Sequence, residues 1–599
     1  MRPLLRLCFG AAQTRDVLLP APSDGHGRWF GKLPAGWSEI WISPSCRRGA
    51  TSFRIEAVRA LSFRDMAPRL LMSPRRTFYA LAAQMVGLED EAALNWRWAL
   101  GREAGSDYSA WRARREPGPM SAPRIAPVFF DLFLDVGQAT ATDIESSCES
   151  IRAQSHDSWR VTLTGSPRDE TVAQHVRALL RETRFRSDGV EAAANAIVGK
   201  FCAGDVLAPT ALAAFAACFN ERRAPDLVYS DELRVDRAGR LERIWRPGWS
   251  PAFQRGVGYV GRAFFFRGAL LDAEPHWREC APEALFTQLA GRLQKERIGS
   301  IARPLFTFPA APQARPRPVP AIYRASAPRV SIVIPTRDRP DLLQACLSSI
   351  FTRTRYQDYQ LVLVDNGTEN ARALELMDQM KREQPRFSVI RSPGPFNFSA
   401  LCNEGAAAAD GDYLVFLNND TQIVSADWIE RLLYFATEPD VGAVGAKLLF
   451  PNGRVQHAGV VLGMGGVAGH FGAGLKETDP GWLGRNLSPH EVSAVTAACL
   501  MIARRKFEAI GGFDAENLPV DLNDIDLCLR LLEQGYRNIC HSEVVLLHRQ
   551  SASRGGGLRL QRVYARERRY FVDRWRRLIR DDPYFNPGLS LYATSASLP

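Results

Sequence analysis

A short polar tip, Asn418–Asp420, carries the strongest chemical signal in the sequence, because it directly follows the apolar run Tyr413–Leu417. A carboxylate and two amides at the end of a buried strand add nothing to a core, but they stand where open α/β sheets bind ligands. Mg²⁺ and Mn²⁺ prefer carboxylate and carbonyl oxygens, and phosphates and water complete their coordination. The tip therefore predicts a site for a divalent metal and a nucleotide diphosphate.

A second protein ligand is expected, since one carboxylate holds a metal weakly. His548, near the end of the run E-V-V-L-L-H, is the candidate, because imidazole suits Mn²⁺ better than Mg²⁺. A structural histidine that merely follows a strand is the alternative. Asp365, at the start of the turn D-N-G-T, can accept hydrogen bonds from a ribose hydroxyl or a base imide. Its alternative is a turn aspartate that caps the next helix.

Asp524 and Asp526 stand at the start of a predicted helix. The apolar face of this helix consists of Ile525, Cys528, Leu529 and Leu532. The helix dipole stabilises an ionised carboxylate there, which suits a general base that takes a proton from a hydroxyl nucleophile. Simple N-terminal capping is the alternative. Because the two aspartates are separated by one position, only one of them can face the site.

Four strand–helix repeats position these side chains. Strands are predicted over 330–334, 360–364, 387–391 and 413–417. The carboxyl ends of parallel strands meet at one edge of a sheet, so the tips P-T-R-D, D-N-G, F-N-F-S and N-N-D are expected to lie together. A similar alternation from about 125 to 300 predicts a second doubly wound α/β unit. Six prolines within 303–323 predict an extended linker between the two units.

Composition restricts the function class only weakly. The net charge of +11, from 76 Lys and Arg against 65 Asp and Glu, favours a nucleotide sugar, an anionic membrane face or nucleic acid as partner. No base-reading motif supports nucleic acid, so we expect none. A solvated surface without a specific partner is the alternative.

Cysteine usage and hydropathy address the compartment. The eleven cysteines occur singly without a C-x-x-C pair, which argues against a disulfide framework and a zinc site. No run approaches the roughly 18 apolar residues of a membrane span. The opening apolar run is too short for a signal peptide, and Arg6 interrupts it. We expect a cytoplasmic protein, with a location at the surface of the cytoplasmic membrane held open. The basic helix after Gly557 is expected to pack on the catalytic domain, and binding to anionic lipid is the alternative.

The motifs, taken together, resemble bacterial glycosyltransferases of family 2, with a GT-A fold, of the O-antigen and surface-polysaccharide type. The resemblance covers about 328–555 and includes V-S-I-V-I-P-T-R-D-R-P, V-D-N-G-T, G-P-F-N-F-S-A-L-C-N-E-G, L-N-N-D-T, V-Q-H-A-G, N-D-I-D-L-C-L-R and S-A-S-R-G. It implies an inverting, metal-dependent hexosyl- or rhamnosyltransferase that uses Mn²⁺ or Mg²⁺. The implied donor is a UDP- or dTDP-sugar, and the implied acceptor is a hydroxyl of a cell-surface glycan or of a polyprenyl-linked oligosaccharide.

Site residues carry over by position. The resemblance implies a donor-nucleotide site made of Pro335, Thr336, Asp338, Asp365, Asn397, Asn403, Asn418 and Asn419. Asn418 replaces the first acid of the family's D-x-D motif, which leaves Asp420 and His548 as the metal ligands. Asp524 matches the catalytic base, and Asn523 replaces the glutamate before it.

The upstream unit resembles a worn copy of the same family. Its K-F-C-A-G-D segment stands where the family has an Asp-rich metal motif and keeps a single aspartate, Asp205. The segment E-A-L-F-T-Q-L-A is expected to lack the acid of a base motif. A non-catalytic scaffold or acceptor-holding module is expected, and a working site at Asp231 and Glu232 is the alternative. The Gly-rich stretch from Gly463 predicts a flexible loop over the donor site.

The expected fold class is α/β, with two GT-A-like, Rossmann-like domains in tandem after a small β-rich and helical N-terminal region. The expected segments are a β-rich region at 1–66, a helical connector at 67–122, a degenerate GT-A-like domain at 123–300, a Pro-rich linker at 301–327, a catalytic domain at 328–556, and a basic amphipathic helix with a tail at 557–599. A catalytically inactive carbohydrate-binding or assembly protein of a polysaccharide complex is the alternative function.

Overall fold

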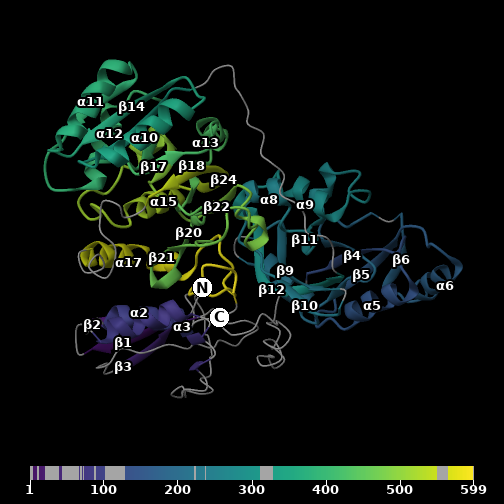
Figure 1. Cartoon of the computed structure of the whole chain (residues 1–599). Coiled ribbons are helices and arrows are strands. Elements are labelled where there is room, and N and C mark those ends of the chain that lie inside the picture. The colour runs from purple at the N-terminus through teal and green to yellow at the C-terminus, as the bar shows by residue number, and fades with distance from the viewer. Residues whose placement is uncertain are drawn as a thin grey trace.

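The computed structural model describes residues 4–9, 13–19, 39–43, 66–67, 70–71, 73–85, 89–100, 128–189, 191–221, 224–236, 238–309, 328–549 and 564–597. Most of the expected linker, the S-A-S-R-G motif and the start of the basic helix lie outside these residues. The N-terminal part holds an antiparallel sheet and two helices (Figure 1). Its elements are β1 (Leu4–Phe9), β2 (Gln13–Leu18), β3 (Glu39–Ser43), α2 (Pro74–Met85) and α3 (Glu89–Leu100).

The sheet that carries the candidate site has the order β15-β14-β13-β16-β23-β18-β24-β17. Its strands are β13 (Val330–Thr336), β14 (Tyr359–Asp365), β15 (Phe387–Arg391), β16 (Tyr413–Leu417), β17 (Thr421–Ile423), β18 (Val441–Leu449), β19 (Val455–His457), β22 (His490–Val492), β23 (Cys499–Ala503) and β24 (Arg537–His548). All seven residues of β13 are buried, as a central parallel strand covered on both faces requires.

Helices and one hairpin complete this second domain. The helices are α10 (Pro340–Arg353), α11 (Ala371–Glu383), α12 (Phe398–Ala408), α13 (Trp428–Ala436), α14 (Arg504–Ala509) and α15 (Asn523–Glu533). The Gly-rich stretch is not an irregular loop but a hairpin of β20 (Val460–Leu462) and β21 (Ala468–His470), joined by the 3₁₀ turn η3 (Met464–Gly466). A second 3₁₀ turn, η4 (Trp482–Gly484), follows it.

The first large domain repeats the strand order of the second. Its strands are β4 (Phe130–Asp135), β5 (Trp159–Thr164), β6 (Phe185–Ser187), β7 (Ile197–Cys202), β8 (Val206–Leu207), β9 (Leu227–Val235), β10 (Leu241–Ile244), β11 (Phe264–Arg267) and β12 (Ile298–Pro309). They run in the order β6-β5-β4-β7-β11-β9-β12-β8, with β10 on β9 as β19 lies on β18. Each neighbouring pair also has the same parallel or antiparallel direction as its counterpart. The expected tandem α/β architecture is therefore confirmed.

The helices of the first domain are α5 (Ala141–Arg152), α6 (Glu170–Leu179), α7 (Ala211–Phe219), α8 (Pro251–Val257) and α9 (Pro282–Ala290), with 3₁₀ turns η1 (Gly268–Ala273) and η2 (Lys295–Arg297). The expected boundary at residue 300 is wrong, because β12 continues to Pro309. Two prolines are tolerated in this strand because its register with β9 shifts on either side of Pro304, and Pro309 is the last residue.

The two large domains share a buried polar interface (Figure 1). Glu491 of β22 is 1% exposed and accepts hydrogen bonds from the Ser250 hydroxyl and the Ala252 amide at the start of α8. The same carboxylate pairs with the Arg537 guanidinium at 2.6 Å. A helix N-terminus and an arginine thus neutralise one buried acid from both sides.

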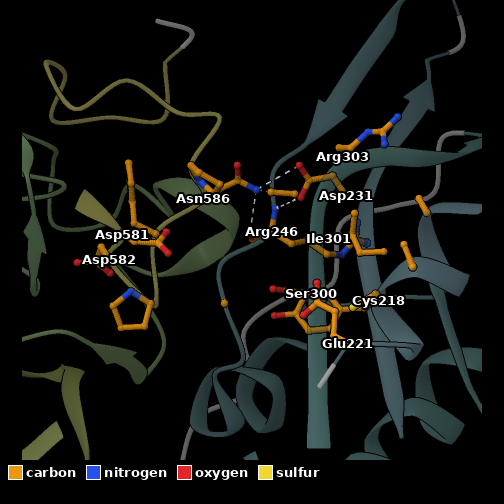
Figure 2. Close-up of a pocket in the computed structure, with 18 of the residues that line it drawn as sticks. Cys218, Glu221, Asp231, Arg246, Ser300, Ile301, Arg303, Asp581, Asp582 and Asn586 are labelled. Carbon is orange, nitrogen blue, oxygen red and sulfur yellow. Dashed lines mark hydrogen bonds between the residues drawn. The ribbon is translucent and has the colours of Figure 1, made fainter. Parts of the chain in front are cut away.

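The C-terminal segment forms a second connection between the domains. Helix α17 (Ala565–Arg580) buries Phe571, Trp575 and Ile579, so its apolar side packs on the protein, as expected. Beyond it, the Asn586 amide donates to the Asp231 carboxylate at 2.9 Å. A cavity of about 1090 Å³ lies between this segment and the first domain (Figure 2). No helix in the described ranges is long and apolar enough to cross a membrane.

Candidate active site

The ends of β13, β14 and β16 bring the predicted nucleotide residues to one edge. The Asn419 amide donates to the Thr336 hydroxyl at 2.9 Å, and the Asn366 backbone donates to the Thr336 carbonyl at 2.9 Å. Asp365 is 1% exposed, and one of its oxygens accepts from the Thr368 backbone at 2.8 Å. That bond places Asp365 in the turn, but Asn370 caps the next helix, so the capping alternative for Asp365 is wrong. The second carboxylate oxygen lies 3.9 Å from Arg391 Nε.

Asp338 ties the loop after β13 to the loop after β14. Its Oδ1 accepts from the backbones of Glu369 and Asn370 at 2.9 and 3.0 Å, and these bonds hold the pKa of the carboxyl below its usual value. Asp338 and Arg339 both adopt positive φ, at 51° and 44°. Two successive non-glycine residues in the left-handed region store strain, which the paired loops hold in place.

Asp420 and His548, the predicted metal ligands, face each other at the ends of β16 and β24. His548 Nε2 lies 3.0 Å from Asp420 Oδ1, and both side chains are buried. The Asn418 amide lies 3.3 Å from the same imidazole nitrogen. Strand pairing places the two elements together, because β17 runs antiparallel to the end of β24 and Thr421 pairs with His548.

Gln456 fixes the proton on His548. The Gln456 amide nitrogen donates to the His548 carbonyl at 3.1 Å, which turns the Gln456 oxygen toward His548 Nδ1 at 2.6 Å. Nδ1 must therefore carry the proton of the neutral ring, and Nε2 presents a lone pair to Asp420. A lone pair and a carboxylate oxygen at 3.0 Å repel each other unless the ring is protonated or a cation binds both.

This geometry fits a divalent metal. Neighbouring ligands of an octahedral ion with bonds of about 2.1 Å are about 3 Å apart, as these two atoms are. In the ranges that the structure describes, no cluster of three or more His, Cys, Asp or Glu side chains forms a metal site. A metal here would take two protein ligands, Asp420 and His548, and the rest of its shell from phosphates and water.

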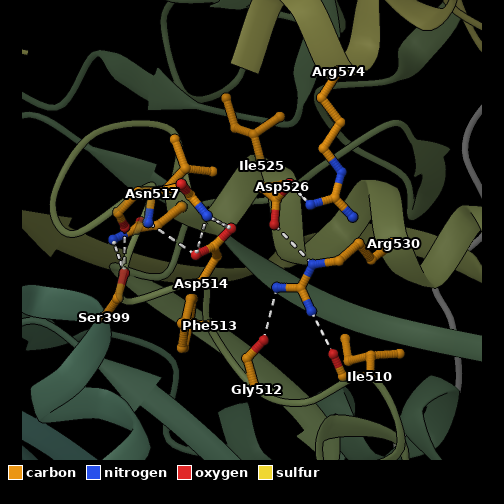
Figure 3. Close-up of polar contacts among 12 residues, drawn as sticks. Ser399, Ile510, Gly512, Phe513, Asp514, Asn517, Ile525, Asp526, Arg530 and Arg574 are labelled. Carbon is orange, nitrogen blue, oxygen red and sulfur yellow. Dashed lines mark hydrogen bonds and ion pairs between the residues drawn. The ribbon is translucent and has the colours of Figure 1, made fainter. Parts of the chain in front are cut away.

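Asp524 and Asp526 point to different sides, as their spacing requires. Asp524 is partly exposed and accepts from the Ala497 backbone at 3.0 Å, next to β23. Asp526 is fully buried and accepts from Arg530 at 2.7 Å (Figure 3). It also accepts from the Trp575 indole at 2.9 Å. Asp526 therefore joins α15 to α17, and Asp524 is the carboxylate left for the site edge.

Asn397 and Asn403 hold the loop after α14. The Asn397 amide donates to the Ala515 carbonyl at 2.9 Å, and its oxygen caps α12 at Ala400. The Asn403 amide exchanges two hydrogen bonds of 2.9 Å with the backbone of Phe513. Both side chains bind backbone atoms. They would therefore affect donor binding indirectly, by holding this loop in place.

Two histidines to which the motifs assigned no role lie at the same site. His457 Nδ1 is 2.7 Å from His470 Nδ1, and burial lowers the pKa of both rings. The Asp524 carboxylate raises and the His548 imidazole lowers the pKa of His470, so His470 lies within electrostatic range of the candidate base and the candidate metal ligand. The motif V-Q-H-A-G contains both His457 and Gln456 and was the available signal.

In the first domain, the Arg262 guanidinium stands beside Asp205, the counterpart of Asp420. Asp205 follows β7 by three residues, as Asp420 follows β16, and it pairs with the Arg262 guanidinium at 2.9 Å. Burial raises the pKa of Asp205 to about 6. The expected loss of the acid at the base position is wrong, because Glu283 stands second in α9 as Asp524 stands second in α15.

Asp231 and Glu232, the alternative site of this domain, are engaged in buried ion pairs. Asp231 pairs with Arg243 at 2.9 Å, and Glu232 pairs with Arg246 at 2.6 Å. Figure 2 shows Asp231 between Arg246 and Asn586 of the C-terminal segment. Asp231 thus links the first domain to the C-terminal segment, whereas Arg234 and Arg246, which pair with Glu232, belong to the same domain as Glu232.

The second domain matches a known sequence family. Residues 331–511 match the sequence model of the family described as Glycosyl transferase family 2. Protein y4gI of Sinorhizobium fredii, described as uncharacterized, is 32% identical over 504 residues, which cover 74% of this chain and 55% of that protein. O-antigen biosynthesis protein RfbC of Myxococcus xanthus is 32% identical over 560 residues, which cover 82% of this chain and 43% of that protein. The chain spans about half the length of these curated relatives.

A solved structure, the mannosyltransferase PcManGT from Pyrobaculum calidifontis in complex with GDP-Man and Mn²⁺, aligns with a TM-score of 0.32 at 17% identity. The alignment covers 44% of this chain and 67% of that one. The family match covers the strands that carry Thr336, Asp365 and Asp420. Residues 331–511 of the second domain thus carry the sequence pattern of glycosyl transferase family 2.

Proposed function

We propose that the second domain transfers a sugar, with inversion, from a UDP- or dTDP-sugar to a hydroxyl of a surface glycan or of a polyprenyl-linked oligosaccharide. The observation that carries the proposal is the Asp420–His548 pair, whose two electron-rich atoms face each other at 3.0 Å beside the nucleotide edge. The family match supports glycosyl transfer in general. The name of RfbC, an O-antigen biosynthesis protein, supports a surface glycan as the product.

The donor would bind with its nucleoside along the ends of β13 and β14. The free oxygen of Asp365 accepts from a base imide or a ribose hydroxyl, and the Thr336–Asn419 pair forms the floor beneath it. The diphosphate then reaches Asp420 and His548. A divalent metal bound there would act as a Lewis acid for the departing diphosphate.

Asp524 would act as the base on the acceptor. Its carboxylate takes the proton of the acceptor hydroxyl while that oxygen forms a bond to the anomeric carbon. The bond from the anomeric carbon to the phosphate oxygen breaks, and its electron pair leaves with the nucleoside diphosphate. Attack from the face opposite the nucleotide inverts the anomeric centre. The Ala497 amide donates to Asp524 Oδ2 at 3.0 Å and the Ile525 amide to Oδ1 at 2.8 Å, so both bonds orient the carboxylate while each oxygen keeps a second lone pair for the acceptor hydroxyl. The chain from Ala494 to Arg505 forms the proposed acceptor wall.

Nucleotide release in the presence of Mn²⁺ and a panel of UDP- and dTDP-sugars tests the reaction. We expect at least one donor to release nucleotide faster with a matching acceptor. In the variant Asp524→Asn, turnover should fall by about 10²–10⁴-fold, while donor binding measured by calorimetry stays. The control is Glu533→Gln, an exposed acid on the same helix, which should keep full turnover.

Retained turnover in Asp524→Asn would exclude it as the base. Neither binding nor release with any donor would instead favour an inactive carbohydrate-binding or assembly protein.

A further inference from the structure

The histidine pair His457–His470 lies beside the candidate active site and has no role in the reaction proposed above. The two Nδ1 atoms are at hydrogen-bond distance, so one ring must donate a proton to the other. His457 is buried, and its Nε2 has no hydrogen-bond partner among the residues that the structure describes. His470 is partly exposed. The pair therefore has one buried end and one end that a ligand can reach.

Strand pairing places the accessible end next to the proposed acceptor wall. His470 of β21 stands opposite Val460 of β20. The Val460 amide in turn donates to the Ala494 carbonyl at 2.9 Å. Three residues further along this wall, the Ala497 amide binds the Asp524 carboxylate. The backbone of His470 thus lies two strand spacings, about 10 Å, from the segment that orients the proposed base.

The charges around His470 agree with this position. Burial lowers the pKa of His470 below the ordinary value of about 6.5, so the ring is neutral at neutral pH. The Asp524 carboxylate raises this pKa and the His548 imidazole lowers it, so both groups lie near the ring. Because Nδ1 contacts His457, Nε2 is the nitrogen left for a ligand.

The surroundings decide which of the two rings donates. If His470 donated, its Nε2 would present a lone pair to a site that contains the Asp524 carboxylate and the phosphates of a bound donor, and these anions repel a lone pair. If His457 donates, Nε2 of His470 carries a proton that the same anions attract. His457 Nε2 lacks a partner in both arrangements and does not alter the choice. We therefore expect the proton on His470 Nε2.

We propose that His470 Nε2 donates a hydrogen bond to the phosphate oxygen that leaves the anomeric carbon, and that His457 holds the proton of His470 in place for this bond. The inference rests on the proposed transfer reaction and adds a donor to it. The charge on this oxygen grows as its bond to the sugar breaks, so the hydrogen bond strengthens in the transition state. A sugar hydroxyl is a poorer partner, because hydrogen bonds to charged groups are about twice as strong. The proton stays on His470, since a nucleoside diphosphate leaves as an anion.

Calorimetry with Mg²⁺ and either UDP or an intact UDP-sugar tests this hydrogen bond without turnover. The terminal phosphate of UDP carries the charge that the sugar masks in the donor. His470→Phe should therefore weaken UDP binding by about tenfold or more and donor-sugar binding by less than about threefold. His470→Gln restores an N–H group and should recover part of the UDP affinity. The control His276→Gln, at an exposed histidine of the first domain, should bind both ligands as the unchanged chain does.

Kinetics and nuclear magnetic resonance provide two further readouts. With an active donor, kcat of His470→Phe should fall by about 10²–10³-fold, while the donor KM changes little. In the chain labelled with ¹⁵N-histidine, the signals that disappear in His470→Gln should show a protonated Nε2 and a bare Nδ1. A protonated Nδ1 on His470 would overturn the proposal.

The calorimetric outcomes separate this proposal from the proposed function. Unchanged UDP affinity in His470→Phe, or an equal loss for UDP and UDP-sugar, would overturn the hydrogen bond to the leaving oxygen. The same comparison is made with dTDP and a dTDP-sugar if these bind instead. Binding of neither nucleotide would overturn both proposals. If a nucleotide binds but no donor is turned over, the proposed function fails, and the difference between the two ligands still decides the role of His470.

Discussion

At the residue scale, the site depends on which nitrogen of one imidazole carries a proton. Asp420 and His548 were predicted because each ends an apolar strand, and strand ends of a parallel sheet converge. Gln456 was not predicted as a partner, because it lies 92 residues from His548 and only the pairing of β19 and β24 with β18 brings them together. Local patterns find ligands, but the groups that orient a ligand come from elsewhere in the chain.

Gln456→Leu therefore has a definite expected effect. Without the amide oxygen, Nδ1 loses its acceptor, so the ring no longer favours the tautomer with a lone pair at Nε2. We expect Mn²⁺ affinity in the presence of UDP to fall by about 10–100-fold, measured by calorimetry or by the electron paramagnetic resonance signal of free Mn²⁺. The control Gln379→Leu, an exposed glutamine on α11, should leave the affinity unchanged. Equal affinities in both variants would contradict the assignment.

At the element scale, α17 supports the helix that presents Asp524. Glu567 of α17 accepts from the backbones of Val520 and Asp521 at 2.9 and 2.7 Å, just before α15 begins. About two turns further along α17, Trp575 donates to Asp526 inside α15. The 3.6-residue apolar period predicted the packed side of α17, but a buried glutamate that binds a distant turn has no periodic signature.

Glu567→Ala should therefore lower catalysis by shifting the start of α15, which carries Asp524. The freed turn lets the first residues of α15 shift, so we expect kcat to fall by about tenfold or more, while KM for the donor changes little. Glu567→Gln retains an oxygen acceptor and should recover part of kcat, which simple loss of stability would not explain. Steady-state kinetics at saturating acceptor make the comparison. A proportional change in donor KM would point to the nucleotide edge instead.

At the scale of the whole molecule, the two large domains fold as partners. Glu491 joins them directly through Ser250. Asp231 and Gly248, where a Cβ would come within 1.8 Å of the Pro583 carbonyl, join the first domain to the C-terminal segment. Each sheet alone was predictable because strand and helix patterns repeat along the sequence. The interface was not, because Ser250 and Glu491 are 241 residues apart and no sequence pattern pairs them.

Removing the carboxylate at this interface should be costly. Glu491→Ala leaves the Ser250 hydroxyl and the Ala252 amide without their acceptor. It also removes one of the carboxylates around Arg537, which still pairs with Glu438 and Asp440. Each buried donor left unsatisfied costs about 1–3 kcal/mol. We expect a clearly lower melting temperature for the full chain, with Glu491→Gln intermediate. Glu508→Ala, on the exposed side of α14, should stay within about 0.5 kcal/mol of the unchanged chain. A melting temperature equal to that of Glu508→Ala would show that the interface contributes little.

Buried neutral histidines predict sensitivity to acid. Burial lowers the pKa of His490 and of His541 to about 3. The unfolded chain binds these protons below about pH 6.5, whereas the folded chain does not until about pH 3. Their contribution to stability is complete above about pH 6.5 and is lost as the pH falls from there toward 3. Melting temperatures should decline over this window, and less steeply in His541→Phe, because that ring packs against Phe435 at 5.3 Å and loses only its titration.

Because of the Arg262–Asp205 pair, the two similar sheets would differ in how their stability depends on free metal ions in solution. A side-chain guanidinium cannot dissociate, so the first sheet keeps its cation whatever the free metal concentration. The second sheet, with Asp420 and His548, would gain stability only as far as metal is supplied, by mass action. Chelators would thus leave the stability of the first domain unchanged, whereas the stability of the second domain would depend on the concentration of divalent ions.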